Sequence, residues 1–195
     1  MLWLAFFDRD PAPPPTPRTL TPVLWADVAG GPLRMGADTA PVEVVAFGDY
    51  QCPFCRASSA ALDSLRMRRP DVAVSYRAYP LPSHPAADRA AAAALCADDQ
   101  GAFADAHHSL YQGGQPLHQA ESVQLAEALD ITDPDAFASC LDATETSRRV
   151  ERDIALGRLI GIEGVPTFVV NGLVLEGGQT LADLEVAVDA VSSEK

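Results

Sequence analysis

The pattern of apolar and polar positions predicts a strand-helix-strand unit in the first half of the chain. Residues 42–47 have the β-branched and aromatic content of a buried strand, and Ala61, Leu62 and Leu65 suit an amphipathic helix over residues 56–68. Residues 72–79 alternate as a second strand would. Elements in this order predict a right-handed unit in which the two strands are parallel.

The end of the chain shows a second sheet signal after a long helical stretch. Residues 166–170 and 173–175 are apolar runs separated by Asn171-Gly172, which favours a two-residue hairpin, and a last helix is expected over residues 181–191. Helices are expected at 86–98, 102–111, 121–128, 135–141 and 145–159, with a glycine-rich break at 113–116. Asp133 and Thr144 are candidate helix caps.

Together these elements predict an α/β fold of the thioredoxin-like kind. The order is βαβ, then an all-helical insertion over about residues 84–160, then ββα, around a small central sheet with helices on both faces. At 195 residues, the chain is expected to form one domain with an N-terminal extension.

The extension is expected to cover residues 1–29, and the domain residues 30–195. Residues 1–7 are apolar but shorter than a membrane span, and five prolines make residues 8–17 a stiff spacer. We interpret this as the remnant of a hydrophobic leader, with a small strand or cap packed on the domain as the alternative. Residues 23–25 are expected to form a short strand or a hydrophobic plug.

The net charge of −13 excludes a strongly basic surface. Nucleic acids and anionic membranes are bound through clustered Lys and Arg, so the composition argues against both as partners.

The candidate chemistry lies in Cys52-Pro53-Phe54-Cys55, between the first predicted strand and its helix. The partial positive charge at a helix N-terminus would stabilise a thiolate on Cys52, which makes it the candidate nucleophile. Cys55 lies one turn further on the same face, where a disulfide can close. A zinc site would need further ligands at short spacing, so redox chemistry is favoured over a metal site or inert buried thiols.

Four cysteines allow three pairings. The favoured pairing is Cys52 with Cys55 and Cys96 with Cys140. The last two residues are alternatively buried free thiols or a second exchanging pair.

Several separate motifs resemble the DsbA-type thiol-disulfide oxidoreductases, a thioredoxin fold with an inserted helical subdomain. The resemblance runs from about Gly30 to Val191. It rests on residues 47–55 around the CxxC, on Tyr79-Pro80-Leu81 followed by His84-Pro85, on Cys96 with His107, on Phe137 with Cys140, and on residues 164–168 followed by Asn171-Gly172.

The resemblance implies that Pro166 is a cis-proline facing the CxxC. Phe54, Val165 and Pro166 would then bind an extended substrate chain beside Cys52. The implied activity is disulfide exchange with unfolded or reduced proteins, as a dithiol oxidase reoxidised by a membrane quinone-linked partner. It implies no metal, flavin or nucleotide, and a location in the periplasm or cell envelope, with the cytoplasm as the alternative. A monomer is the default expectation.

Two departures from the family pattern modify this expectation. Ala46 stands where thioredoxin-fold enzymes commonly carry a buried acid, and Phe54 stands where the strongest oxidants carry His. We therefore expect a weaker oxidant than those members. The alternative functions are a disulfide reductase or isomerase, a peptide-binding module with incidental cysteines, and a glutathione-dependent transferase.

Overall fold

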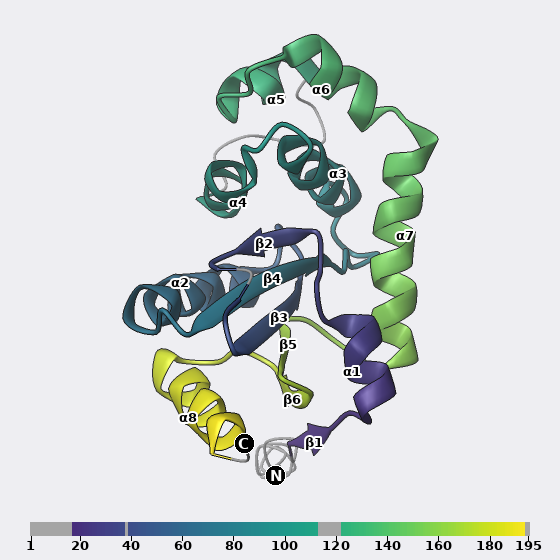
Figure 1. Cartoon of the computed structure of the whole chain (residues 1–195). Coiled ribbons are helices and arrows are strands. Elements are labelled where there is room, and N and C mark those ends of the chain that lie inside the picture. Colours follow the sequence, from purple (N-terminus) through teal and green to yellow (C-terminus); the bar gives the residue numbers. More distant parts are fainter. Residues whose placement is uncertain (1–16, 38, 113–121, 194–195) are drawn as a thin grey trace, which may run out of the picture.

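The computed structural model describes residues 17–37, 39–112 and 122–193, in which helices cover both faces of one mixed sheet (Figure 1). The strands are β1 (Arg18–Thr19), β2 (Leu33–Met35), β3 (Val42–Gly48), β4 (Val72–Ala78), β5 (Thr167–Val170) and β6 (Leu173–Glu176). The helices are α1 (Pro22–Val28), α2 (Pro53–Arg68), α3 (Ala87–Asp98), α4 (Phe103–Gln112), α5 (Ser122–Ala128), α6 (Pro134–Leu141), α7 (Thr144–Leu159) and α8 (Leu181–Ser192). The predicted fold class, with its helical insertion, is confirmed.

The strands are ordered β1-β6-β5-β3-β4-β2. As predicted, β3 and β4 are parallel, and every other pairing in this sheet is antiparallel. The hairpin between β5 and β6 turns at Asn171 and Gly172, both with positive φ, as this two-residue turn requires. The central strand β3 ends directly before the CxxC, so the sheet positions that segment.

Alternate residues of β3 divide between two hydrophobic cores. Val44 and Ala46 face the core shared with α2 and α8, while Val45 and Phe47 face a smaller core shared with α1. Figure 1 shows α2 and α8 on one side of the sheet and α1 and α7 on the other. Burial on both faces explains why β3 is an almost continuous apolar run.

Helix α7 connects the helical insertion back to the sheet at two positions one turn apart. The Asp153 carboxylate lies 2.8 Å from Arg77 and accepts from the backbone N–H of Ala78 at 3.0 Å. At Gly157, an added Cβ would lie 2.6 Å from the ring of Tyr79. The insertion is therefore attached to β4 by a buried ion pair and by a close approach that requires glycine.

Of the two expectations for residues 23–25, the short strand was wrong, because they lie within helix α1, whereas Leu24 and Trp25 do pack against the smaller core. The Thr21 hydroxyl accepts from the backbone N–H of Leu24, and Pro22 occupies the first turn. Strands β1 and β2 were not predicted. The capping prediction was right for Asp133, which accepts from Ala136, and wrong for Thr144, since the cap residue there is Ala143.

The apolar run at 1–7, residues 8–16 of the spacer, the break at 113–116 and Glu121 lie outside the described residues. Residues 18–28 are described, and they contribute β1 and α1 to the sheet and the smaller core.

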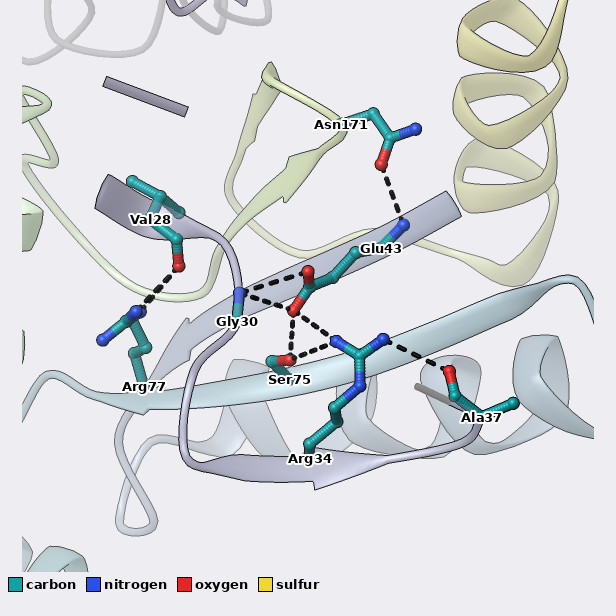
Figure 2. Close-up of polar contacts among 8 residues, drawn as sticks. All are labelled: Val28, Gly30, Arg34, Ala37, Glu43, Ser75, Arg77 and Asn171. Carbon is teal, nitrogen blue, oxygen red and sulfur yellow. Dashed lines mark hydrogen bonds and ion pairs between the residues drawn. The ribbon is translucent and has the colours of Figure 1, made fainter. Parts of the chain in front are cut away.

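Figure 2 shows how Glu43, at the start of β3, holds the neighbouring segments together. Its carboxylate accepts from the backbone N–H of Gly30 at 3.1 Å and from the Ser75 hydroxyl, and it lies 2.8 Å from Arg34 of β2. Its backbone N–H donates to Asn171 at 2.9 Å. This charged network lies at the end of β3 opposite to the CxxC.

Candidate active site

Cys52 is the residue that directly precedes α2, with Pro53 at the first helical position as predicted. Its backbone N–H donates to the carbonyl of Asp49 at 3.1 Å, and its carbonyl accepts from Arg56 at 3.1 Å. The Cys52 side chain makes no capping hydrogen bond. Its sulfur therefore lies at the positive end of a sixteen-residue helix, where negative charge is stabilised.

A buried carboxylate fixes the loop before Cys52. Asp49 accepts from the backbone N–H groups of Gln51 and Leu81 at 2.7 and 2.8 Å. His84 Nδ1 lies 2.7 Å from the same carboxylate. The Gln51 amide oxygen in turn accepts from Ala86 at 2.6 Å. These contacts bind the loop to the segment before α3, so Asp49 fixes the position of the loop that leads to Cys52.

The structure brings one of the three candidate substrate-binding residues, Val165, next to the Cys52 sulfur. The Cys52 sulfur lies 3.8 Å from the carbonyl oxygen of Val165, and the Val165–Pro166 bond is cis as predicted. Pro166 is buried, and Val165 is half-buried. The Phe54 side chain is 68% exposed, although large aromatic residues are usually covered. The Cys52 side chain itself is only 4% exposed, so its sulfur is largely covered where it lies close to the Val165 carbonyl.

Cys55 lies in the first turn of α2 and is only 3% exposed. Burial raises the pKa of its thiol well above the ordinary value; a backbone hydrogen bond at Asp49 opposes the rise and the Cys52 thiol adds to it. Cys55 is therefore protonated at neutral pH when the pair is reduced. Both thiols are free in this structure.

A cluster of buried rings, which the sequence alone did not predict as a unit, lies next to Cys55. The Tyr50 hydroxyl is 2.8 Å from His107 Nδ1, and the Tyr111 hydroxyl donates to Tyr76 at 3.2 Å. Burial raises the pKa of each of these tyrosines and lowers the pKa of His107 to about 3. The cluster is therefore uncharged at neutral pH.

Helical spacing was the available signal for part of this cluster. Within the cluster, Tyr111 follows His107 by four residues on α4, so the two rings share one helix face. Next to the cluster, Ser59 follows Cys55 by four residues on α2 and shares a face with it in the same way. Tyr76 lies opposite Ala46 in the parallel pairing of β4 with β3.

The second cysteine pair is bonded, which confirms the Cys96–Cys140 half of the favoured pairing. The disulfide joins Cys96 of α3 to Cys140 of α6, with Cα atoms 5.8 Å apart. Both residues belong to the helical insertion.

No group of three or more potential metal-ligating side chains occurs among residues 17–37, 39–112 and 122–193. Over the same part of the chain, none of the helices has the length and apolar character needed to cross a membrane.

A family model described as thioredoxin matches residues 29–190. The chain belongs to this family. The fold, its helical insertion and the cysteine pair at the start of α2 define a thioredoxin-like thiol-disulfide oxidoreductase of DsbA type.

Solved structures support the assignment. A thioredoxin-like oxidoreductase from Silicibacter pomeroyi is 29% identical, with a TM-score of 0.75 over 82% of this chain and 91% of that one. DsbA2 of Pseudomonas aeruginosa is 26% identical, with a TM-score of 0.71 over 83% and 94%. A periplasmic thioredoxin-like protein of Salmonella enterica, 22% identical with a TM-score of 0.71 over 89% of this chain and 98% of that one, shares the fold.

Curated relatives are longer proteins. The chain is 36% identical to a Na(+)/H(+) antiporter NhaA of Salinispora arenicola, over 78% of this chain and 24% of the relative. It is 32% identical to an NhaA of Mycobacterium sp. (strain KMS), over 96% of this chain and 31% of the relative. The chain thus spans about a quarter to a third of the length of these relatives.

Proposed function

We propose that this chain is a dithiol oxidase that transfers the Cys52–Cys55 disulfide to cysteines of unfolded or reduced proteins. The observation that carries the proposal is the position of the Cys52 sulfur. It lies at a helix N-terminus, 3.8 Å from the Val165 carbonyl, and the exposed Phe54 side chain follows two residues further along the chain. An extended peptide can pair with the backbone at Val165 while its apolar side chains contact Phe54.

The reaction proceeds by two thiol-disulfide exchanges. A substrate thiolate attacks the Cys52 sulfur, the Cys52–Cys55 bond breaks, and Cys55 leaves with the electron pair and takes up a proton. A second substrate thiolate then attacks the substrate sulfur of the mixed disulfide and displaces Cys52 as a thiolate. The substrate gains one disulfide and the CxxC gains two electrons.

We place this activity outside the cytoplasm, with a membrane quinone-linked oxidoreductase as the reoxidant. Three observations support the location. The Cys96–Cys140 disulfide is stable in oxidising compartments. One fold neighbour is described as periplasmic, and the curated relatives named above are described as antiporters.

The reduction potential of the pair tests the direction of exchange. We expect a value more negative than about −120 mV, the potential of a strongly oxidising member of this class, because Phe54 offers no cation to stabilise the reduced form. The measurement is equilibration with glutathione buffers, followed by counting alkylated thiols by mass.

Single-turnover oxidation of a reduced two-cysteine peptide tests the activity itself. We expect one peptide disulfide per oxidised protein. A potential close to that of cytosolic thioredoxins would favour a reductase, and exchange no faster than in buffer would contradict the proposal.

A further inference from the structure

A small cavity lies directly beneath Cys55, between α2, α4 and the ends of the central strands. Its volume is about 10 Å³, close to the least space that holds one water molecule. Its walls are largely apolar, and its polar lining groups are the side chains of Cys55, Ser59, Tyr76, His107 and Tyr111. Among the residues that the structure describes, no carboxylate lines it.

Exchange chemistry requires a proton to cross this region. When a substrate thiolate opens the Cys52–Cys55 bond, the sulfur of Cys55 must be protonated, and when Cys55 attacks a mixed disulfide it must first lose that proton. Burial raises the pKa of Cys55, so a free thiolate there is costly. Each turnover therefore moves one proton between a buried sulfur and solvent.

Among the described residues, the titratable side chains around Cys55 are Cys52 directly before α2, Asp49 in the preceding loop, Tyr76 on β4, and His107 and Tyr111 on α4. The Asp49 carboxylate already accepts from two backbone N–H groups and lies beside His84. Burial raises the pKa values of Tyr76 and Tyr111, so both hydroxyls stay protonated at neutral pH.

Ser59 is the one half-buried residue among the five polar lining groups. It lies one turn after Cys55, and its hydroxyl is 3.3 Å from His107 Nε2. The other ring nitrogen of His107 is 2.8 Å from the Tyr50 hydroxyl. The imidazole is thus held between two hydroxyls, and because it is neutral above about pH 3 it stores no proton.

We propose that Ser59 carries the proton between Cys55 and solvent through one water molecule in this cavity, and that His107 is a positioning residue for the Ser59 hydroxyl. In the resolving direction, the proton leaves the Cys55 sulfur through the water to Ser59, whose own proton passes to solvent. The Cys55 thiolate then attacks Cys52 and expels the substrate thiolate. The proposal rests on the proposed exchange activity of the CxxC.

The test follows the resolving step in isolation. Reduced protein is mixed with oxidised glutathione, quenched with acid at set times between pH 6 and 9, and the mixed disulfide and the Cys52–Cys55 disulfide are counted by mass. For S59A we expect resolution about tenfold slower, less than the full effect of a general acid or base because water partly replaces the hydroxyl. S59T should retain a rate within about twofold of the parent, since it keeps the hydroxyl.

The matched control is S64A, which removes another serine hydroxyl from the same helix, one that donates to the carbonyl of Ala60. It should resolve at the parent rate. The equilibrium constant with glutathione should be the same for S59A and S64A, because a relay speeds both directions equally.

Two results would overturn the relay: equal resolution rates in S59A and S64A, or a changed equilibrium in S59A with an unchanged rate. If the parent itself forms no Cys52–Cys55 disulfide, the proposed function fails instead, so the two failures are distinct.

A double-mutant cycle tests the role of His107. H107F keeps the ring volume and removes both nitrogens, and it should slow resolution in the parent but not in S59A. If the two substitutions slow resolution additively, His107 does not act through Ser59.

Discussion

The two cysteine pairs of this chain differ in bonding and in their place in the fold. Cys96 and Cys140 join two helices of the insertion across 44 residues of sequence, and they are bonded. Cys52 and Cys55 are three residues apart, at the junction of the sheet and α2, and their thiols are free in this structure. The first pair closes a long loop, which removes much entropy from the unfolded chain, whereas the second closes a very short one.

The comparison teaches that position in the fold, and not residue type, separates a stabilising disulfide from an exchanging pair. The sulfur of Cys52 lies 3.8 Å from the carbonyl oxygen of Val165, at the start of α2. Cys140 instead lies near Thr146 and the Asp99 side chain, which is paired with Arg149. Mutating each pair separately, and measuring both exchange activity and stability, tests this comparison directly.

The largest expected effect is that of Cys52→Ala on exchange. Without the attacked sulfur, oxidation of a reduced peptide should fall to the rate of the buffer control, a loss of at least about a hundredfold. Urea unfolding should show a loss of about 1 kcal/mol, because the small Cys52 side chain is buried in the main core but makes no capping bond. Exchange that persists in C52A would mean that another thiol carries the activity.

The double variant Cys96→Ala/Cys140→Ala should show the reverse pattern. The loop-entropy relation gives a loss of about 4 kcal/mol for a closed loop of this length, with the reduction potential of the CxxC unchanged. Urea unfolding and glutathione equilibration, each on both proteins, measure the two quantities. A shifted potential would show that the insertion disulfide influences the site.

The raised pKa of Cys55 predicts a pH-dependent stability. The unfolded chain loses this thiol proton near pH 9 and the folded protein keeps it, so the stabilising contribution is complete below pH 9 and declines above it. In a C52A background, stability should fall by about 1 kcal/mol more between pH 9 and 10 than in C52A/C55A. Parallel curves for the two variants would mean that Cys55 titrates normally in the fold.

The smallest expected effect belongs to Phe54. Phe54→Ser should slow exchange with an apolar peptide about threefold, since part of the contact area is lost, and leave exchange with glutathione unchanged. Comparing the two substrates on the same variant separates peptide contact from chemistry. Equal slowing of both would instead indicate a changed Cys52.

The sequence predicted those features whose signals are local. Cys52 and Cys55 share one motif, and the proximity of Pro166 to Cys52 followed from a family resemblance that also implied its cis bond. Residues 23–25 were misread because three adjacent apolar side chains resemble a strand, although Thr21 and Pro22 carried a helix-start signal.

The ring cluster required information that no single segment contains. Tyr76 comes from β4 and Tyr111 from α4, and their hydroxyls meet only because α4 packs over the end of the sheet. Gly48 permits that approach, since an added Cβ would lie 2.9 Å from the Tyr111 hydroxyl. Contacts made by packing across an insertion are not visible in spacing along the chain.

The packing of α7 against the end of β4 limits how far the helical insertion can rotate relative to the sheet. Asp153 pairs with Arg77, and Gly157 packs closely against Tyr79. Rotation of the helical insertion would therefore expose a buried charge and also separate α7 from the ring of Tyr79. A larger side chain at residue 157 would push α7 away from Tyr79. The helical insertion would then shift relative to the sheet that carries the CxxC, without a direct contact to either cysteine.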